Sequence, residues 1–444
     1  MKIFNGLSTS TTLRWLAAFL FLYGLGVSIA TRQVSFYMPD EGAHYLRAYE
    51  VSKLHLINFR GSVGVDIPCG EYTVAATKYN PIALVQKKAI DGQADATCRV
   101  RTISAAGSYS FVPYLPAALA LALVERLNWT TEGKLIAARI ANFTVWFSIL
   151  FFSLLLLDKG RILMACLILM PSFFWQLVAL SADGATFASC LAYVFFVHRI
   201  AQRKLDLNSG LVKILIALAI FIGASKGVYA PVALLAFGLW GRLSDKGWLY
   251  KFSILSLPVL AAFGTFFVLL IFSDPSLVYL GNDANPGLQI TYVLQNPFSS
   301  MNLILKTIFS IDLLGLVAPT YAVPNPGRGF GIMIASILAI IVVLLNSNLE
   351  IDKTLRIVAG TSAMIVVAGF SIPIYLTYSP VGADNIFGLQ GRYYLPAIPL
   401  VFIACAFKAS EVDWIHIFHR FRRRVDWVII ISVLGLIVAV FNIK

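Results

Sequence analysis

The chain has 444 residues, of which 59% are hydrophobic and 13% are charged. A soluble domain does not carry so much apolar sequence, so the composition excludes that class and indicates an integral membrane protein with several spans. The net charge of +13 does not indicate a nucleic-acid partner, because no soluble basic domain is present and basic residues of membrane proteins gather in cytoplasmic loops and beside lipid phosphates.

The first apolar run covers residues 13–30 and is long enough to cross a bilayer. It lacks a small-residue cleavage site, so we interpret it as a retained anchor and not as a signal peptide. Lys2 and Arg14 place the amino end in the cytoplasm, because cytoplasmic flanks of membrane helices are rich in lysine and arginine. The segment after Arg32 is therefore expected outside.

Directly after this anchor, residues 38–47 concentrate ionisable side chains in a chain that has few of them. If a helix begins at Asp40, then Asp40, His44 and Arg47 share one of its faces. Glu41 adds a second carboxylate beside Asp40. The segment also carries an apolar stripe, typical of a helix that lies along a membrane surface, formed by Leu46, Tyr49, Leu54 and Ile57.

The next apolar run, residues 111–124, contains two prolines and is too short for a typical crossing. The basic clusters farther along the chain fall on one side of the membrane only if this run does not cross. The first external region then extends over residues 32–133, and its length indicates a functional loop with interfacial helices. It contains Cys69 and Cys98, which could form a disulfide if the loop faces an oxidising compartment.

The remaining apolar runs alternate in direction and bring the number of crossings to about eleven. They are residues 135–157, 162–180, 185–197, 211–224, 228–240, 252–272, 329–345, 355–376, 395–407 and 427–441. Residues 273–328 form a second large external region, whose apolar stretch 303–319 is expected at the membrane interface. The sequence therefore predicts an all-α integral membrane protein with a single domain, residues 1–444.

Several further ionisable residues lie in or beside apolar runs on the external side of this topology. They are Arg139, Asp183, Lys226, Arg328 and Arg392. Ionisable groups at membrane depth cost free energy, so each is a functional candidate. Lys226 suits a phosphate as a point charge. Arg392 and the following Tyr393 suit a phosphate clamp beside an aromatic surface for a sugar or an isoprenoid.

The sequence leaves a structural interpretation open for each candidate. Asp40 or Asp183 would simply cap the helix that follows it, and a lone histidine such as His44 is more often hydrogen-bonded than catalytic. Lys226 would reach lipid headgroups with its long side chain, and Arg392 would belong to an interfacial belt.

Motifs for other chemistry are weak or absent in the sequence. No Walker A, G-x-S-x-G or dinucleotide-binding pattern is present, so ATP-driven and nicotinamide chemistry has no support. A carboxylate with one imidazole is weak evidence for a metal, so we predict no metal site. The cofactor stays open, including a divalent cation such as Mg²⁺ or Mn²⁺.

Four motifs, taken in chain order, resemble those of a bacterial polytopic family. They are Pro39-Asp40-Glu41 with His44 and Arg47, Ser181-Ala182-Asp183, Lys226 before Tyr229, and Gln390-Gly391-Arg392-Tyr393-Tyr394-Leu395-Pro396. This family was long catalogued as a domain of unknown function, and it looks like a branch of the GT-C glycosyltransferases. The resemblance covers nearly the whole chain. Gly42 departs from it, because proline is expected there.

The resemblance implies a GT-C-like bundle and a sugar donor linked to a polyprenyl phosphate. Asp40 then matches the catalytic carboxylate, with Glu41 beside it, and Asp183 matches a second acidic position. Asp40 would deprotonate an acceptor hydroxyl, with inversion at the anomeric carbon. Lys226 and Arg392 would hold the leaving phosphate. The residues expected to contact substrate are His44, Arg47, Asp183, Lys226, Arg328, Arg392 and Tyr393.

The expected acceptor is a glycan or lipid of the cell envelope, such as O antigen, at the periplasmic face of the bacterial inner membrane. The partners are then this acceptor, the donor and membrane lipids. Two other functions remain open. A transporter or flippase of lipid-linked glycans would show repeated halves, which the sequence lacks. An O-antigen polymerase or ligase would place its main charges in a late external loop, whereas here the acidic pair is early.

Overall fold

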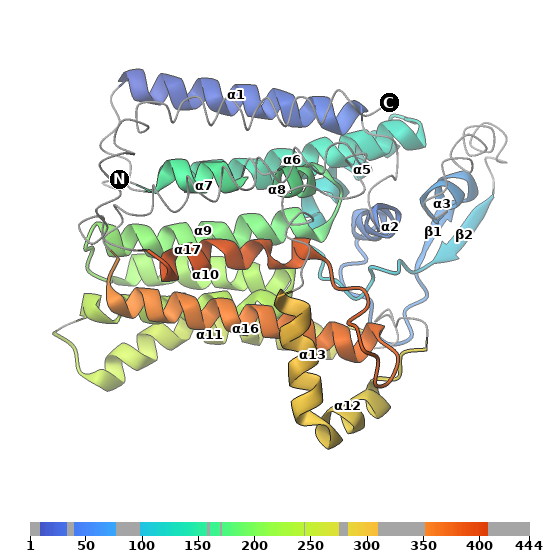
Figure 1. Ribbon diagram of the computed structural model, residues 1–444. Helices are drawn as coiled ribbons and strands as arrows, with labels where there is room; N and C mark the ends of the chain where they lie inside the picture. Colours follow the sequence, from blue (N-terminus) through green and yellow to red (C-terminus); the bar gives the residue numbers. More distant parts are fainter. Residues whose placement is uncertain are drawn as a thin grey trace, which may run out of the picture.

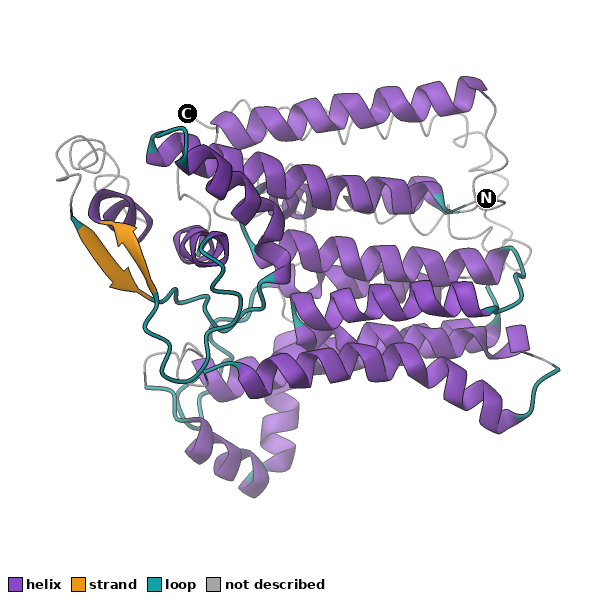
Figure 2. Ribbon diagram, turned by 180° about the vertical axis from the view of Figure 1, so that it is seen from behind, coloured by secondary structure: helices purple, strands orange, loops and turns teal. Residues whose placement is uncertain are grey.

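The computed structural model describes residues 9–32, 40–76, 98–157, 160–168, 171–243, 245–274, 283–309 and 351–406. Long helices run side by side along one direction, and smaller elements gather at one end of this bundle (Figures 1 and 2). We call this end the α2 end, after helix α2 (Glu41–Ser52), and we call the other the opposite end.

Five helices in the described ranges are long and apolar enough to cross a membrane. They are α1 (Thr9–Arg32), α6 (Thr131–Leu155), α9 (Ala182–Gln202), α11 (Trp248–Phe272) and α16 (Lys353–Tyr378). Each coincides with a predicted crossing, which confirms the all-α membrane class. The total of eleven crossings stays a prediction, because residues 329–345 and 427–441 lie outside the described part of the chain.

Other predicted crossings coincide with shorter helices of the described residues. Residues 162–180 were expected as one span, and the described residues there form two short helices, the second of which begins at a proline. The elements are α7 (Arg161–Ile168), α8 (Pro171–Val178), α10 (Ser209–Ser225), η4 (Gly391–Ala397) and α17 (Ile398–Ala404).

The predicted crossing at residues 228–240 is a 3₁₀ helix, η2 (Gly227–Leu243), and not an α-helix. A 3₁₀ helix rises about 2.0 Å per residue, so its 17 residues reach roughly 34 Å. The same number of residues in an α-helix would reach only about 26 Å. The 3₁₀ geometry therefore makes η2 long enough for a hydrocarbon core of about 30 Å.

The centre of the bundle is α9, and almost all of its residues are buried. It packs against α6, α10 and η2, and its apolar side chains belong to a core shared by most of the long helices. In contrast, α11 exposes many large apolar side chains, among them Leu260 and Ile271. An exposed apolar surface of this kind marks contact with lipid in a membrane protein.

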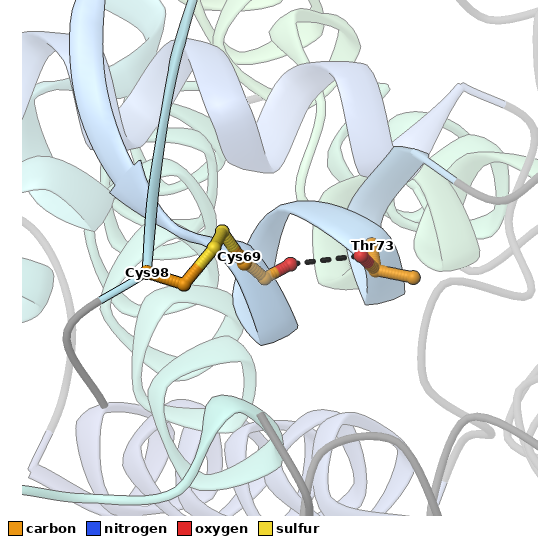
Figure 3. Close-up of a disulfide and its surroundings, with 3 residues drawn as sticks. All are labelled: Cys69, Thr73 and Cys98. Carbon is orange, nitrogen blue, oxygen red and sulfur yellow. Dashed lines mark hydrogen bonds between the residues drawn. A yellow bond between two sulfur atoms is a disulfide. The ribbon is translucent and has the colours of Figure 1, made fainter. Parts of the chain in front are cut away.

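The α2 end carries the small sheet of the described residues, an antiparallel pair of β1 (Val65–Pro68) and β2 (Arg99–Thr102). Cys69 and Cys98, whose pairing the sequence left open, form a disulfide at the base of this pair, where α3 (Cys69–Ala76) begins (Figure 3). The Thr73 hydroxyl donates to the Cys69 carbonyl at 2.8 Å. The covalent bond thus fixes α3 to the sheet.

The run at residues 111–124 forms η1 (Val112–Tyr114) and α5 (Leu115–Glu125). An α-helix of 11 residues is about 16 Å long, which is half of a hydrocarbon core. It packs against α2 and α6. The length and the packing support the prediction that this run does not cross.

Helix α2 does not present the apolar stripe that the sequence predicted for a membrane-surface helix. Tyr45, Leu46 and Tyr49 are buried, and α2 packs against α5 and α3. Leu54 lies beyond the end of the helix and is 81% exposed. The surface-helix prediction is therefore wrong, because protein and not lipid covers the apolar side of α2.

A close contact explains the glycine at position 42. A Cβ atom added to Gly42 would lie 1.9 Å from the carbonyl oxygen of Ala75 in α3. Any larger residue, proline included, would push the two helices apart. The departure from the family pattern thus accompanies the close approach of α2 and α3.

Candidate functional site

Asp40 is the residue before α2, and its carboxylate does not act as a helix cap. The backbone is in the left-handed region, with φ at 63°, and the side chain makes no capping hydrogen bond. A left-handed conformation in a residue other than glycine is uncommon and is found more often at functional sites. The side chain is 66% exposed. Asp40 therefore presents a carboxylate that is open to a ligand.

Arg392 in η4 brings Asp40 together with Asp183. Its Nη2 lies 3.5 Å from Oδ2 of Asp40, and its Nε lies 3.8 Å from Oδ2 of Asp183. The guanidinium is only 8% exposed, whereas Asp40 is largely exposed. Arg392 thus links an exposed carboxylate to a buried one.

Asp183 lies in the first turn of α9, but Ser181 is the capping residue. The Ser181 hydroxyl accepts a hydrogen bond from the Asp183 backbone N–H. The Asp183 carboxylate instead accepts a bond from Nζ of Lys226 at 2.5 Å. Lys226 ends α10 directly before η2, so the break between these two helices carries the cation.

Aromatic rings surround the two cations. Nζ of Lys226 lies 5.3 Å from the centre of the Tyr109 ring and 5.6 Å from that of Tyr393. Cζ of Arg392 lies 5.4 Å from the Tyr393 ring. Rings at these distances stabilise a cation through their negative faces. Tyr229 donates to the Tyr393 carbonyl at 2.8 Å and so holds η4 at this place.

His44 lies beside this cluster and hydrogen-bonds another tyrosine. Its Nδ1 is 2.7 Å from the hydroxyl of Tyr114, and its ring is near the rings of Tyr109 and Tyr114. Burial, and then the positive charge of Lys226, lower the pKa of His44 to about 4. The imidazole is therefore neutral at neutral pH and can share a single N–H proton with its surroundings.

Glu41 does not share the open position of Asp40. Both of its carboxylate oxygens accept hydrogen bonds from Arg139, at 2.8 and 2.6 Å, and one also accepts the backbone N–H of Leu180. Both side chains of the ion pair are fully buried. The predicted catalytic role of Glu41 does not fit this arrangement, because its carboxylate is enclosed and fully engaged. It fixes the start of α2 to α6.

Arg47 is enclosed as well. Its guanidinium donates to Glu50 at 2.8 Å, to the carbonyl of His55 at 3.0 Å, to that of Leu56 at 2.6 Å and to that of Tyr109 at 3.2 Å. The side chain has no exposed surface. The predicted substrate contact does not fit this geometry. Arg47 instead ties the end of α2 to the loop that carries Tyr109.

The structure thus brings together four residues that the sequence selected, Asp40, Asp183, Lys226 and Arg392, which we call the open cluster. Tyr393 and His44 border it. Arg328 lies outside the described residues, so its role stays a prediction. Tyr109, in a loop, and Tyr114, at the end of η1, were missed because isolated tyrosines carry no spacing signal.

The open cluster combines two cations with two carboxylates. Buried cations beside aromatic rings can hold an anion such as a phosphate, while an exposed carboxylate can accept a proton. In the described ranges, no group of three or more His, Cys, Asp or Glu side chains could hold a metal ion. The chemistry that these residues suit best is therefore anion binding combined with general base catalysis.

Comparison with known proteins gives a family but no activity. The family described as "Predicted membrane protein (DUF2142)" matches residues 21–401, a span that includes every residue of the open cluster. No curated protein matches the chain, and no solved structure matches it. The chain belongs to the DUF2142 family of predicted membrane proteins.

Proposed function

We propose that this protein is a membrane glycosyltransferase that moves a sugar from a polyprenyl-phosphate donor to a cell-envelope glycan or lipid, such as O antigen. The observation that carries the proposal is the open cluster, in which Arg392 lies 3.5 Å from the exposed Asp40 and shares the buried Asp183 with Lys226. An exposed carboxylate that could act as a base thus lies beside Arg392, which Asp183 joins to Lys226, at the α2 end of the bundle. A lipid-linked donor keeps its chain in the bilayer and presents its phosphate at this level.

In the proposed reaction, Asp40 accepts the proton of the acceptor hydroxyl as the oxygen attacks the anomeric carbon of the donor sugar. The bond between that carbon and the phosphate oxygen breaks, and the electron pair leaves with the polyprenyl phosphate. Lys226 and Arg392 stabilise the charge on this leaving group. A single displacement with one base inverts the anomeric configuration.

The enclosed ion pairs support this role without contact to the substrate. Glu41 with Arg139 fixes the first turn of α2, and the hydrogen bonds of Arg47 to loop carbonyls fix its end. Asp40 directly precedes this helix. Because contacts hold both ends of this short helix, Asp40 keeps a fixed position. A transferase needs such a fixed base for an aligned attack.

Two features support a periplasmic location of the α2 end in a bacterial inner membrane. The disulfide between Cys69 and Cys98 lies there, and disulfides persist in oxidising compartments. Basic residues flank the helix termini at the opposite end, as expected for the cytoplasmic side. Among them are Arg161, Arg199, Arg203, Lys204, Arg242, Lys246, Lys251, Lys353 and Arg356.

The test is an assay of the purified protein with synthetic polyprenyl-phosphate sugars and envelope acceptors, with and without EDTA. We expect transfer from one donor with inversion, and loss of transfer in Asp40→Asn. Asp384→Asn is the matched control, since Asp384 is an exposed carboxylate on the segment before Arg392 but lies outside the open cluster.

Two results would overturn the proposal. One is full transfer by correctly inserted Asp40→Asn protein. The other is movement of lipid-linked sugars between leaflets by wild-type protein that transfers none of them, which would indicate a flippase. The EDTA arm decides whether a divalent cation is needed.

A further inference from the structure

Two helices at the α2 end lie outside the bundle of long helices (Figure 1). They are α12 (Pro286–Gln295) and α13 (Pro297–Phe309), which a single residue, Asn296, connects. In Figure 1, α13 runs at a steep angle to α16, whereas the other long helices run nearly parallel to α16. Because α16 is long enough to cross the membrane, a helix at a steep angle to it lies close to the membrane plane.

The outer sides of these helices carry several large apolar side chains. On α13, Phe298, Met301 and Leu305 are exposed, and their spacing of three and four residues places them on one face. On α12, Leu294 is 75% exposed, and Phe298 at the start of α13 is 82% exposed. A contiguous apolar face of this kind marks a contact surface.

The charge of the pair favours lipid over a protein partner. From residue 286 to residue 309 there is no acidic residue, and Lys306 supplies the one charge. An apolar face with a basic side chain near its edge is typical of helices that lie in the headgroup layer. The lysine can then reach a lipid phosphate.

The apolar face is also continuous with a surface that faces lipid. Helix α13 packs on α16. The exposed side of α16 is itself apolar and includes Met364, which is 68% exposed, and Ile372. The same environment that covers α16 therefore extends to α13.

The pair is fixed to the segment that leads to the open cluster. Oε1 of the buried Gln289 accepts the backbone N–H of Gly382 at 2.9 Å, and Ala284 pairs with Pro380 in an isolated β-bridge. Both contacts join residues that precede Arg392 in the chain. The helices are thus held at a defined level along the bundle.

We propose that α12 and α13 lie in the interfacial layer of the bilayer leaflet at the α2 end, with Phe298, Met301 and Leu305 among the acyl chains. Such a helix is buried about 5–10 Å into the boundary between headgroups and chains. The occupant of this apolar face is lipid, and not a second copy of the chain. This inference does not depend on the transferase proposal.

The test uses the photoreactive amino acid p-benzoylphenylalanine in the full chain, reconstituted into vesicles of phosphatidylethanolamine and phosphatidylglycerol. One variant carries it in place of Phe298. The matched control carries it in place of Ser299, which is exposed but points about 100° away around the helix. After illumination, mass spectrometry of the purified protein counts adducts with lipid chains.

We expect several-fold more lipid adduct at position 298 than at position 299. Equal lipid adducts at both positions, or no lipid adduct at either, would overturn the inference. A crosslinked dimer at position 298 would overturn it as well and would identify a second copy as the occupant. Leu294 and Gln295 provide a second pair of exposed neighbours if either first variant does not fold.

Discussion

Two groups of charged side chains begin within one residue of each other at the start of α2, and they are built differently. Glu41 and Arg139 form a fully buried pair with two parallel hydrogen bonds. Asp40 and Arg392 lie 3.5 Å apart, with Asp40 largely exposed. The enclosed pair has satisfied its hydrogen-bonding groups, whereas the open cluster keeps a carboxylate accessible. Burial of charge alone therefore does not identify a residue that a ligand can reach, and the exposure of Asp40 is what separates it from Glu41.

The sharpest separation of the two groups is expected from Asp40→Asn. Loss of a general base lowers the rate of transfer by about 10²–10⁴-fold. The free energy of unfolding should change by only about 0.5 kcal/mol, because the side chain is exposed and makes no capping bond. Transfer assays and chemical unfolding of the same preparation measure both. A marked fall in the free energy of unfolding of Asp40→Asn would indicate that Asp40 has a structural role, like the enclosed pairs.

The opposite pattern is expected from Glu41→Gln. Removing one charge of a buried ion pair leaves the Arg139 guanidinium uncompensated, which costs about 3–5 kcal/mol of stability. Thermal unfolding in detergent checks this result. The double variant Glu41→Leu with Arg139→Met should recover most of the loss, because it removes both charges. A Glu41→Gln protein that is stable but inactive would contradict the structural role and support the predicted catalytic role of Glu41.

A smaller effect, on binding, is expected from Arg392→Gln. A hydrogen bond to a charged group contributes about 1.5–3 kcal/mol, so the KM for the donor should rise by roughly one to two orders of magnitude. The matched control is Arg242→Gln, which removes an ion pair with Asp352 at the opposite end. Equal effects of both variants on KM would contradict the phosphate role.

The smallest effect concerns His44 and the pH dependence of stability. Its pKa is about 4 in the folded protein and near 6.5 when unfolded, so the unfolded state binds more protons between these values. Stability is therefore fully present above pH 6.5 and falls as the pH is lowered toward 4, by on the order of 1–2 kcal/mol near pH 5. Melting curves of wild type and His44→Gln measure the difference. If both lose the same stability between pH 6.5 and 5, His44 does not titrate as proposed.

The sequence alone predicts the membrane class and selects the four residues of the open cluster. Alternating spans placed Asp183, Lys226 and Arg392 at one end, because each lies where an apolar run begins or ends. In the structure, successive segments from α6 to α11 run in alternating directions between the two ends of the bundle, with α7 and α8 taken as one segment (Figures 1 and 2).

The roles of Glu41 and Arg47 could not be separated from that of Asp40 by spacing. Their difference depends on Arg139, which lies 98 residues from Glu41 in the chain, and on carbonyl groups that no sequence pattern marks. Glu50, three residues after Arg47, was the one local signal of an ion pair. Tyr109 became part of the site only because Arg47 and the folded loop place its ring beside Lys226.

The central position of α9 has a consequence for how the chain enters the bilayer. Among the five long apolar helices of the described residues, α9 has the lowest mean hydropathy, 1.3, compared with 2.5 for α11. Insertion of a helix from the translocon depends on its apolar content, and Asp183 lowers that content further. We expect α11 to enter lipid alone, whereas α9 needs its packing partners α6, α10 and η2 to cover its polar groups. We therefore expect α9 to insert stably only together with these partners, so that a chain truncated directly after α9 should insert less well than the full chain.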